Sequence, residues 1–320
     1  MSKRIPVIIL FLVSTMLPAI GQSDCAKLIE AAGAGNINTL EAFLEKGISP
    51  NCVYKVQNGP RTALNAAARN NQVKVAELLL SAGAKVDFKA SGDATPLIAA
   101  SRKGNTQMAN LLLENGAKAN RNVSGDGNAL ISAARAGQYD LAVGLIKYGA
   151  KVSSNVSGDG TPLIAAVNGG NEHIVKLFLE KGANPNRSSN GDGSPLIMAV
   201  KKGNLKMVQH LIAEGAFADK AVRGDASPLI MAARKGETEI MEYLIAQGAN
   251  VNREVPGDET PLIAAAWNGH LEAVKILIAK GADINLSTRE NSEIRSALRM
   301  AQKEGHQQVE AYLIAQGAKD

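Results

Sequence analysis

The sequence has few aromatic residues and few residues that bind metals. Phe, Trp and Tyr make up 3% of the 320 residues, which disfavours the stacking surfaces that bind nucleic-acid bases or sugars. Four histidines and two cysteines are too few for a multi-ligand metal centre or a framework of several disulfides. We therefore expect no nucleic-acid partner, no cofactor and no metal. With 45% hydrophobic and 20% charged residues, the chain still has the composition of an ordered globular protein.

The apolar run near the N-terminus is too short to cross a bilayer. It covers residues 5–17, whereas a membrane-spanning helix needs roughly 20 residues. The run follows the basic pair Lys3 and Arg4 and precedes Pro18 and the small residues of positions 19–21. This order is typical of a secretory signal peptide, and the length disfavours the alternative of an uncleaved anchor.

Cleavage is expected before Gln22, which makes residues 1–21 a signal peptide. The protein is then periplasmic or secreted, with no membrane span after cleavage. Loss of Lys3 and Arg4 lowers the formal net charge by two, from +5 to +3, because the segment holds no Asp or Glu. So mild a charge does not indicate a polyanionic partner.

A period of 33 residues runs through the rest of the chain. The dipeptide Pro-Leu begins at positions 96, 162, 195, 228 and 261, and Gly-Ala begins at positions 83, 116, 149, 182, 215, 248 and 281. Good helix-capping residues stand two positions before the leucine: Thr95, Asn128, Thr161, Ser194, Ser227 and Thr260. A capping residue followed by Pro at the first helical position predicts a short helix in each unit. A second amphipathic helix follows, for example over Val73–Ser81 and Leu271–Lys280, and ends at a glycine that can adopt the left-handed conformation.

These motifs resemble the ankyrin repeat family. Thr95-Pro96-Leu97-Ile98-Ala99-Ala100 with Gly116-Ala117, and Thr260-Pro261-Leu262 with Gly281-Ala282-Asp283, are similar to its pattern. The resemblance implies an all-α fold in which residues 22–320 form a single array of about nine helix-turn-helix units with β-hairpin fingers. First helices are expected near Leu28, Leu64, Leu97, Leu130, Leu163, Leu196, Leu229, Leu262 and Leu298. The chain departs from the family's pattern in the residue after Pro-Leu, which is Ile or another residue where His is usual, and in Gly-Asp replacing Asp-Gly in the link.

The Gly-Asp pair recurs before the capping residue. It begins at positions 92, 125, 158, 191, 224 and 257. Glycine supplies backbone freedom and the aspartate can accept amide hydrogen bonds in the turn that leads into the helix. The alternative, a row of calcium sites, is disfavoured because a single carboxylate per repeat coordinates a hard cation poorly.

The two cysteines, Cys25 and Cys52, are expected to form a disulfide in an oxidising compartment. A loop of this size contributes about 3 to 4 kcal/mol in the chain-entropy model. It would staple the first repeat, at an end of the array that is prone to fray. Two unpaired thiols are the alternative.

Partner-binding residues are sought where the resemblance places them, on a concave face built from the fingers and the ends of the first helices. The helix-end positions give Arg69, Arg102, Lys103, Arg135, Lys201, Lys202, Arg234 and Lys235. The finger positions give Tyr54, Phe88, Arg121, Arg187 and Arg253. This basic edge predicts a protein partner with an acidic surface. The alternative is that the arginine stems only cover the neighbouring repeat.

Trp267 and the two end fingers differ from the rest of the array. Trp267 is the only Trp and stands where six other units carry Arg, Lys or Asn, so we expect an interface anchor, with packing against its neighbours as the alternative. The first and last fingers are three residues longer than the others, since Gly47–Gly83 and Gly281–Gly317 are separated by 36 positions. They could grip a partner at both ends or shield the terminal repeats.

Nothing in the sequence predicts an active site. The histidines His173, His210, His270 and His306 are not expected to cluster, and no nucleophile or metalloprotease motif stands near them. We expect a non-catalytic protein that is monomeric when free. Its predicted role is to inhibit, or protect against, an envelope enzyme such as a peptidoglycan hydrolase by covering the active-site surface. The alternatives are a periplasmic scaffold or stress-protection protein with several partners and a secreted effector that binds a host protein.

Overall fold

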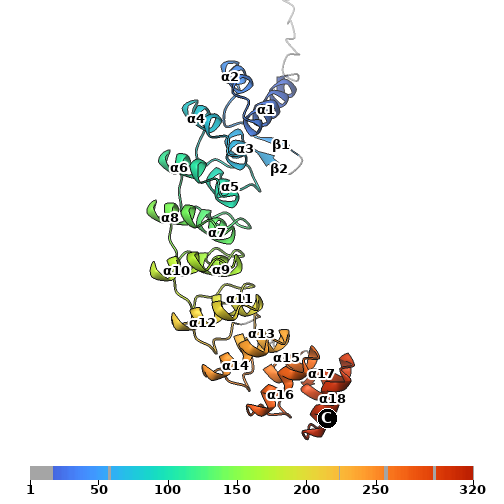
Figure 1. Cartoon of the computed structure of the whole chain (residues 1–320). Helices are drawn as coiled ribbons and strands as arrows, with labels where there is room; N and C mark the ends of the chain where they lie inside the picture. Colours follow the sequence, from blue (N-terminus) through green and yellow to red (C-terminus); the bar gives the residue numbers. More distant parts are fainter. Residues whose placement is uncertain (1–16, 57–58, 223, 256–258, 291–292, 320) are drawn as a thin grey trace, which may run out of the picture. The chain divides into compact units, whose positions relative to one another are not determined.

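The computed structural model describes residues 17–56, 59–222, 224–255, 259–290 and 293–319. Over these residues the chain forms eighteen helices and four short strands (Figure 1). It divides into two compact units, Met1–Lys118 and Ala119–Asp320, and each is described by itself. Most of the predicted signal peptide, residues 1–16, lies outside the described residues.

The first unit contains three helix pairs and one hairpin. Its helices are α1 (Leu17–Ala34), α2 (Ile37–Glu45), α3 (Ala63–Arg69), α4 (Val73–Ser81), α5 (Pro96–Lys103) and α6 (Thr106–Glu114). Strands β1 (Tyr54–Val56) and β2 (Gly59–Arg61) pair antiparallel between the first two helix pairs. The first helices α1, α3 and α5 pack on one another in one row, and α2, α4 and α6 form a second row (Figure 1).

The second unit repeats the same arrangement over six helix pairs. Its helices are α7 (Ala129–Arg135), α8 (Tyr139–Lys147), α9 (Pro162–Asn168), α10 (Glu172–Glu180), α11 (Pro195–Lys201), α12 (Leu205–Ala213), α13 (Pro228–Lys235), α14 (Thr238–Ala246), α15 (Pro261–Trp267), α16 (Leu271–Ala279), α17 (Ala297–Glu304) and α18 (Gln307–Ala315). Strands β3 (Ser287–Glu290) and β4 (Glu293–Ser296) form an antiparallel hairpin before α17. The nine helix pairs of the two units agree with the number of repeats predicted from the sequence.

The six predicted helix-capping residues are confirmed. In all six predicted capping residues the side-chain oxygen accepts a hydrogen bond from the amide three positions later, at 2.9 to 3.3 Å. Each predicted Pro is the first residue of its helix, where the missing N–H leaves no carbonyl unpaired. The glycines after the second helices also adopt the left-handed backbone conformation, as Gly83 (φ 87°) and Gly281 (φ 88°) illustrate.

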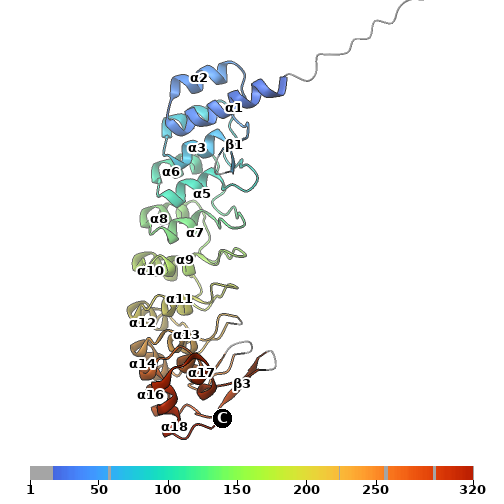
Figure 2. The same ribbon diagram turned by 90° about the vertical axis from the view of Figure 1, so that its right-hand side faces the viewer.

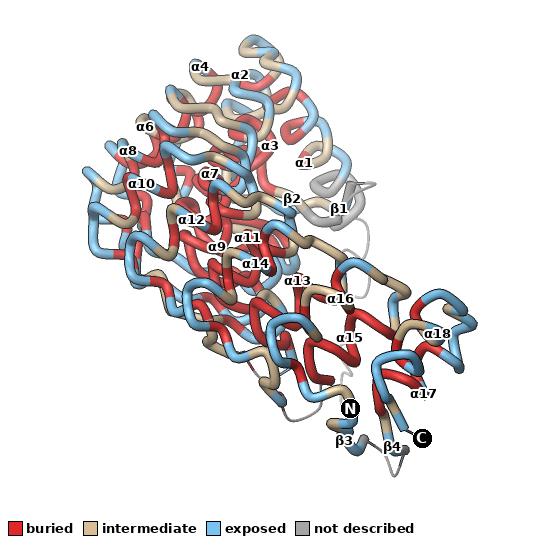
Figure 3. The backbone as a smooth tube through the Cα atoms, turned by 60° about the horizontal axis from the view of Figure 1, so that its bottom comes forward, coloured by how far each residue is buried: buried red, intermediate tan, exposed pale blue. Residues whose placement is uncertain are grey.

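The core of each unit is made of small and branched residues that lie between neighbouring repeats. The first helices are buried almost throughout, as Leu97, Ala99 and Ala100 of α5 illustrate, whereas the second helices bury one face (Figure 3). Phe178 of α10 is the largest fully buried side chain among the described residues. Alanines in the first helices let successive repeats approach closely, which explains how a chain with so few aromatic residues builds a dense core.

The expected start of the first helix is wrong. Eight first helices begin one residue before the expected leucine, but α1 begins at Leu17 instead of near Leu28. Ser23 and Asp24 are residue types that often cap a helix start, but α1 runs through them, and Pro18 is tolerated in the first turn. The helix therefore includes the last residues of the predicted signal peptide.

The expectation of a β-hairpin finger in every unit is also corrected. In the described residues only the two longer fingers form paired strands. Four of the shorter fingers are closed by a single bridge each, Val123 to Gly127, Val156 to Gly160, Ser189 to Gly193 and Val222 to Ala226. Three residues between the bridged positions leave room for a tight turn but not for a ladder, so the three additional residues at each end are what make a hairpin possible.

Candidate functional site

Within each unit the fingers project to one side of the helices, next to the starts of the first helices (Figure 2). The second helices lie on the opposite side. Three of the helix-end residues selected from the sequence, Arg69, Lys201 and Arg234, pair with acids of the following finger. We call the surface formed by the selected helix-end and finger residues of each unit the finger side. Its charge depends on what the basic side chains contact there.

In the first unit the basic residue Arg69 is bound by the finger that follows it. It pairs with Asp93, whose side chain is 8% exposed, and its Nε donates to Oδ1 of Asn65 at 2.8 Å. The acid lies 24 positions after the base, in the next repeat. The charge of Arg69 is therefore compensated within the unit, and its side chain links one repeat to the next.

The second unit repeats this link with other residues. Nζ of Lys201 lies 3.2 Å from Oδ1 of Asp225, and Nη2 of Arg234 lies 2.8 Å from Oε1 of Glu259. Arg135 donates to the backbone carbonyl of the corresponding finger aspartate, Asp159, at 3.4 Å. The acids that balance the charges of Lys201 and Arg234 therefore stand directly beside them.

Two aspartates of the Gly-Asp pairs accept an amide hydrogen bond from the preceding finger, and Asp93 accepts one from the amide of Ala94 at 2.9 Å. Oδ2 of Asp159 accepts from the amide of Gly125 at 3.0 Å, and Oδ2 of Asp225 accepts from the amide of Gly191 at 3.1 Å. Gly191 has φ 86°, which a residue with a side chain adopts only with strain. The pair thus joins neighbouring fingers. The last pair, residues 257–258, lies outside the described residues.

Burial of these aspartates alternates along the second unit. Asp159 and Asp225 are buried, while Asp192 between them is half-buried. Desolvation by burial raises the pKa of Asp192 above its ordinary value of 3.8, and the carboxylates of Asp225 and Asp159 add to the rise. Arg135 and Lys201 oppose it. In this row of carboxylates, the surroundings of Asp192 therefore disfavour its charged form.

Basic residues one position further along the helix ends remain in contact with solvent. Lys103 is exposed in the first unit, and Lys202 and Lys235 are exposed in the second. Arg102 and Arg135 are exposed as well, although both also interact with neighbouring groups. The part of the finger side that can meet a partner's charge therefore includes these lysines, next to bases that are held by acids.

Tyr54 lies at the start of β1, and the other finger positions selected from the sequence lie at the turn that leads into each finger. The amides of Phe88, Arg187 and Arg253 each donate to the carbonyl three residues earlier. Arg121 and Arg187 are exposed, whereas Phe88 is half-buried. The side chain of Arg253, also half-buried, contacts the previous repeat through the carboxylate of Asp219 at 3.4 Å and its carbonyl at 3.0 Å.

Trp267, at the end of α15, is half-buried against the last finger. The guanidinium of Arg295 from β4 lies 4.7 Å from the centre of its ring. The ring nitrogen Nε2 of His306 lies 2.9 Å from the backbone carbonyl of Trp267. One face of the Trp267 ring thus packs against a neighbour, as the alternative raised from the sequence expects. The role of Trp267 as an interface anchor stays a prediction.

Trp267→Ala should loosen the last finger. Loss of the cation–π contact with Arg295 is expected to cost about 1 kcal/mol, and it should appear as faster amide exchange in β3 and β4. Hydrogen exchange followed by mass spectrometry measures this directly. Arg295→Gln removes the same contact from the other side and should give the same pattern. Unchanged exchange in both variants would mean that the stacking does not hold the finger.

A row of asparagines, which the sequence analysis missed, also connects repeats. Asn51 donates to the carbonyl of Gly83 at 3.0 Å and accepts from the amide of Lys85 at 2.8 Å, which ties two successive turns together. The same pair of bonds is made by Asn120, Asn186 and Asn252. These last three are 66 positions apart, so the signal was a period of two repeats rather than one.

The expectation that the histidines do not cluster is wrong for one pair. His173 and His210 line the same pocket on the second-helix side, with Glu172 and Lys206. His270 and His306 stand at the N-cap positions of equivalent helices, and Nε2 of each lies within hydrogen-bond distance of a carbonyl of the preceding repeat. No group of three or more His, Cys, Asp or Glu side chains placed to hold a metal ion is found in the described part of the chain.

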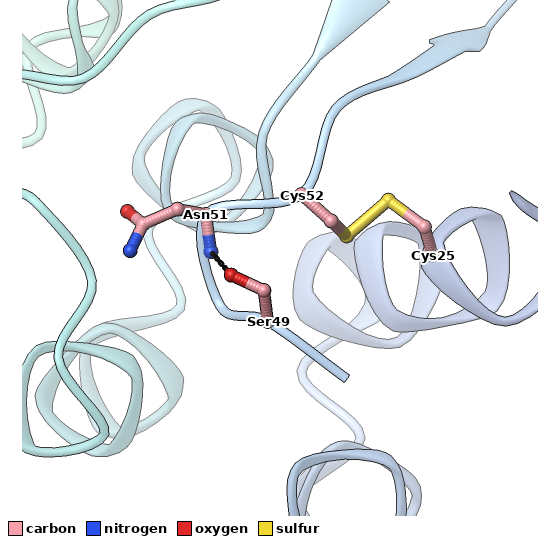
Figure 4. Close-up of a disulfide and its surroundings, with 4 residues drawn as sticks. All are labelled: Cys25, Ser49, Asn51 and Cys52. Atoms are coloured by element: carbon pink, nitrogen blue, oxygen red, sulfur yellow. Dashed lines mark hydrogen bonds between the residues drawn. A yellow bond between two sulfur atoms is a disulfide. The ribbon is translucent and has the colours of Figure 1, made fainter. Parts of the chain in front are cut away.

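A disulfide joins Cys25 of α1 to Cys52, in the loop that precedes β1 (Figure 4). Cys25 is buried, and beside Cys52 the amide of Asn51 donates to the hydroxyl of Ser49 at 3.2 Å. The bond closes a stretch with a sequence separation of 27. It fixes the first finger to the first helix of the first unit.

Comparisons with known proteins agree with this architecture. A family model described as ankyrin repeats in three copies matches residues 16–90, 88–156, 130–223 and 196–288. Among solved structures, the crystal structure of the human ASB11 ankyrin repeat domain is 27% identical, with a TM-score of 0.59. That match covers 71% of this chain and 99% of the other. The comparison with curated proteins gives no match. No helix in the described ranges is both long and apolar enough to cross a membrane.

Proposed function

This chain belongs to the ankyrin repeat family, and from that premise we propose that it acts in the cell envelope by binding and inhibiting an enzyme there, such as a peptidoglycan hydrolase. Ankyrin repeats bind other proteins, and the fold is typically a non-catalytic interaction module. The inhibitory role is the part that is proposed. In it, the finger side covers the active-site surface of the partner.

The disulfide between Cys25 and Cys52 supports a place outside the cytoplasm. Disulfides persist in oxidising compartments such as the periplasm and are rare where thiols are kept reduced. The basic and apolar order of the N-terminal residues favours the same compartment. We therefore propose a periplasmic or secreted protein.

The observation that carries the proposed mode of binding is that some basic residues of the second unit are paired with acids while their neighbours are exposed. Lys201 and Arg234 are held by buried acids, while the adjacent Lys202 and Lys235 are exposed on the same side. The exposed lysines can therefore attract an acidic partner without loss of the links between repeats. Charges of this kind mainly speed association.

Reversal of these two charges should slow binding. The double variant Lys202→Glu with Lys235→Glu is expected to lower the association rate constant about tenfold at low salt, with little effect at high salt. The matched control is Lys147→Glu with Lys181→Glu, which makes the same charge change at exposed positions of the second-helix row. Surface plasmon resonance at two salt concentrations distinguishes them. Equal slowing by both variants would point to net charge alone and not to the finger side.

The inhibitory role is tested by capture followed by an activity assay. The oxidised chain is used to retain proteins from an envelope extract, and the retained enzyme is then purified and assayed with increasing amounts of the chain. One enzyme, inhibited at a fixed stoichiometry, is the expected result. Full activity of the partner in the saturated complex would overturn the inhibitor proposal and leave a binding role only.

One structural feature favours a scaffold as the second candidate. Each unit carries its own hairpin finger, and each finger has a distinct environment: β1 and β2 are tied to α1 by the disulfide, and β4 stacks on Trp267. Two such fingers could hold two proteins. A scaffold predicts that variants of the two fingers abolish the capture of different proteins, whereas an inhibitor predicts that both weaken the capture of the same one.

A further inference from the structure

A pocket of about 540 Å³ opens beside the first finger, within the first unit. Its walls come from α1, from the hairpin and from α3. Ala26, Ile29, Ala34 and Ala66 give it an apolar lining. The volume falls within the range of about 300 to 1,000 Å³ that is typical of ligand sites, where apolar walls surround a small number of polar groups.

The polar group that distinguishes this pocket is Arg61 of β2. Its side chain is half-buried, and its Nε is buried without a hydrogen-bond partner among the described residues. Buried donors are nearly always paired in folded proteins, and an unpaired one costs about 1 to 3 kcal/mol. Because Nε itself is closed to solvent, a ligand of the pocket would be bound by the terminal nitrogens of Arg61, which lines the pocket.

The charges around Arg61 favour an anionic ligand. Arg69 lines the same pocket and is already paired with Asp93. Burial lowers the pKa of Arg61, and the like charge of Arg69 lowers it further, while Asp93 opposes the change. Glu30 is the acidic residue of the lining, and it is exposed. A carboxylate fits the planar guanidinium of Arg61 better than a spherical anion does, because it can accept two parallel hydrogen bonds.

We propose that this pocket binds an Asp or Glu side chain that a short apolar segment of the partner protein presents, with Arg61 as the ligand of the carboxylate. The inference deepens the proposed function and rests on it for the identity of the partner, since the apolar walls would take the residues that flank the acid. The pocket would then add specificity to the long-range attraction exerted by the exposed lysines. Binding of a peptide to the chain alone tests it independently of any partner.

The probe is the peptide acetyl-Ala-Leu-Glu-Leu-Ala-amide, compared with its twin that has Gln in place of Glu. Calorimetric titration into the oxidised full chain should show binding of the acidic peptide about tenfold tighter than that of its twin, the value of one charge-assisted hydrogen bond. In the NMR spectrum the Nε–H signal of Arg61 should move when the acidic peptide is added. Equal binding of the two peptides, or binding of neither, would overturn the proposal.

Two variants of the chain localise the effect. Arg61→Gln should weaken binding of the acidic peptide about tenfold, while Glu30→Gln should strengthen it, because the repulsion between two carboxylates is removed. Arg61→Lys keeps the positive charge but loses the planar, forked arrangement of donors, so its affinity for the acidic peptide should lie between those of Arg61→Gln and the wild type. The Glu30 variant keeps the test decisive if Arg61→Gln disturbs the hairpin. Unchanged peptide affinity in Arg61→Gln and Glu30→Gln would overturn the assignment.

The same variants separate this inference from the proposed function. If the chain inhibits its enzyme and Arg61→Gln inhibits it equally well, the pocket is not used and the inhibitor role stands. If the acidic peptide binds through Arg61 and no enzyme is inhibited, the pocket stands and the inhibitor role fails.

Discussion

Reduction of the disulfide between Cys25 and Cys52 should unfold the first repeat well before the rest of the protein. A bond that closes a sequence separation of 27 restricts the unfolded chain, and its loss costs about 3 to 4 kcal/mol in the chain-entropy model. In a repeat protein each repeat contacts only its neighbours, so the loss falls on the terminal repeat. We expect α1, α2 and the first hairpin to exchange their amide hydrogens much faster in the reduced protein.

Hydrogen exchange with and without dithiothreitol measures this loss. Chemical reduction leaves both sulfur atoms in place, whereas the double variant Cys25→Ala with Cys52→Ala also removes a buried side chain. Comparison of the two therefore separates the crosslink from the packing of Cys25. Reductant should have no effect on the double variant. Equal protection of α1 in the oxidised and reduced chains would contradict the prediction.

Two aspartates at equivalent positions of neighbouring repeats should respond in opposite ways to the same substitution. Asp225, with 5% of its side chain exposed, accepts from the amide of Gly191 and pairs with Lys201. Asp225→Asn should destabilise the second unit by about 2 kcal/mol, because a partly buried ammonium group loses its partner. Asp192→Asn should instead stabilise it, by roughly 0.5 kcal/mol once solvent screening is allowed for.

The gain from Asp192→Asn depends on pH in a defined direction. The ordinary pKa of Asp192 is 3.8, and its pKa in the folded protein is higher. At pH values between the pKa of the unfolded chain and that of the folded protein, the folded state therefore holds more protons than the unfolded state. Stability of the wild type contributed by this group therefore falls as the pH rises through that window. The variant should be more stable than the wild type at pH 7 and equal to it below pH 3.8.

Urea unfolding of both variants at pH 7 and at acidic pH provides the test. The second unit is followed by exchange of the amides in α9, α11 and α13, which the row of aspartates connects. Opposite shifts of the unfolding midpoint at pH 7 are expected. Shifts of the same sign would show that burial of the carboxylate does not decide its contribution.

The repeats could be predicted from the sequence because their signals are local. A capping residue such as Thr95, the proline after it and a glycine such as Gly116 each determine the backbone within a few residues. The start of α1 was missed because Ser23 and Asp24, residue types that often cap a helix start, lie inside the helix. The fingers were overestimated because a period shows where a loop recurs but not whether it is long enough to form a ladder.

The contacts of the finger side could be predicted only in part, since they join residues in different repeats. The sequence shows a basic residue at position 234 and an acidic one at position 259, and nothing local indicates that they meet. The burial that distinguishes Asp225 from Asp192 also depends on neighbouring side chains. Arg61 gave no signal at all, because the importance of its guanidinium arises from a pocket that three separate segments enclose.

The pairing of each base with an acid of the next repeat has a consequence for how such a chain can evolve. Lys201 and Asp225 are separated by 24 positions, less than one 33-residue period. Suppose that recombination duplicated the segment from Gly203 to Lys235. The old lysine would then meet the first copy of Asp225, and the basic residue at the end of each copy would again face an acid. Arrays of different length could thus arise in single genetic steps, and no basic residue at a helix end would be left without an acidic partner.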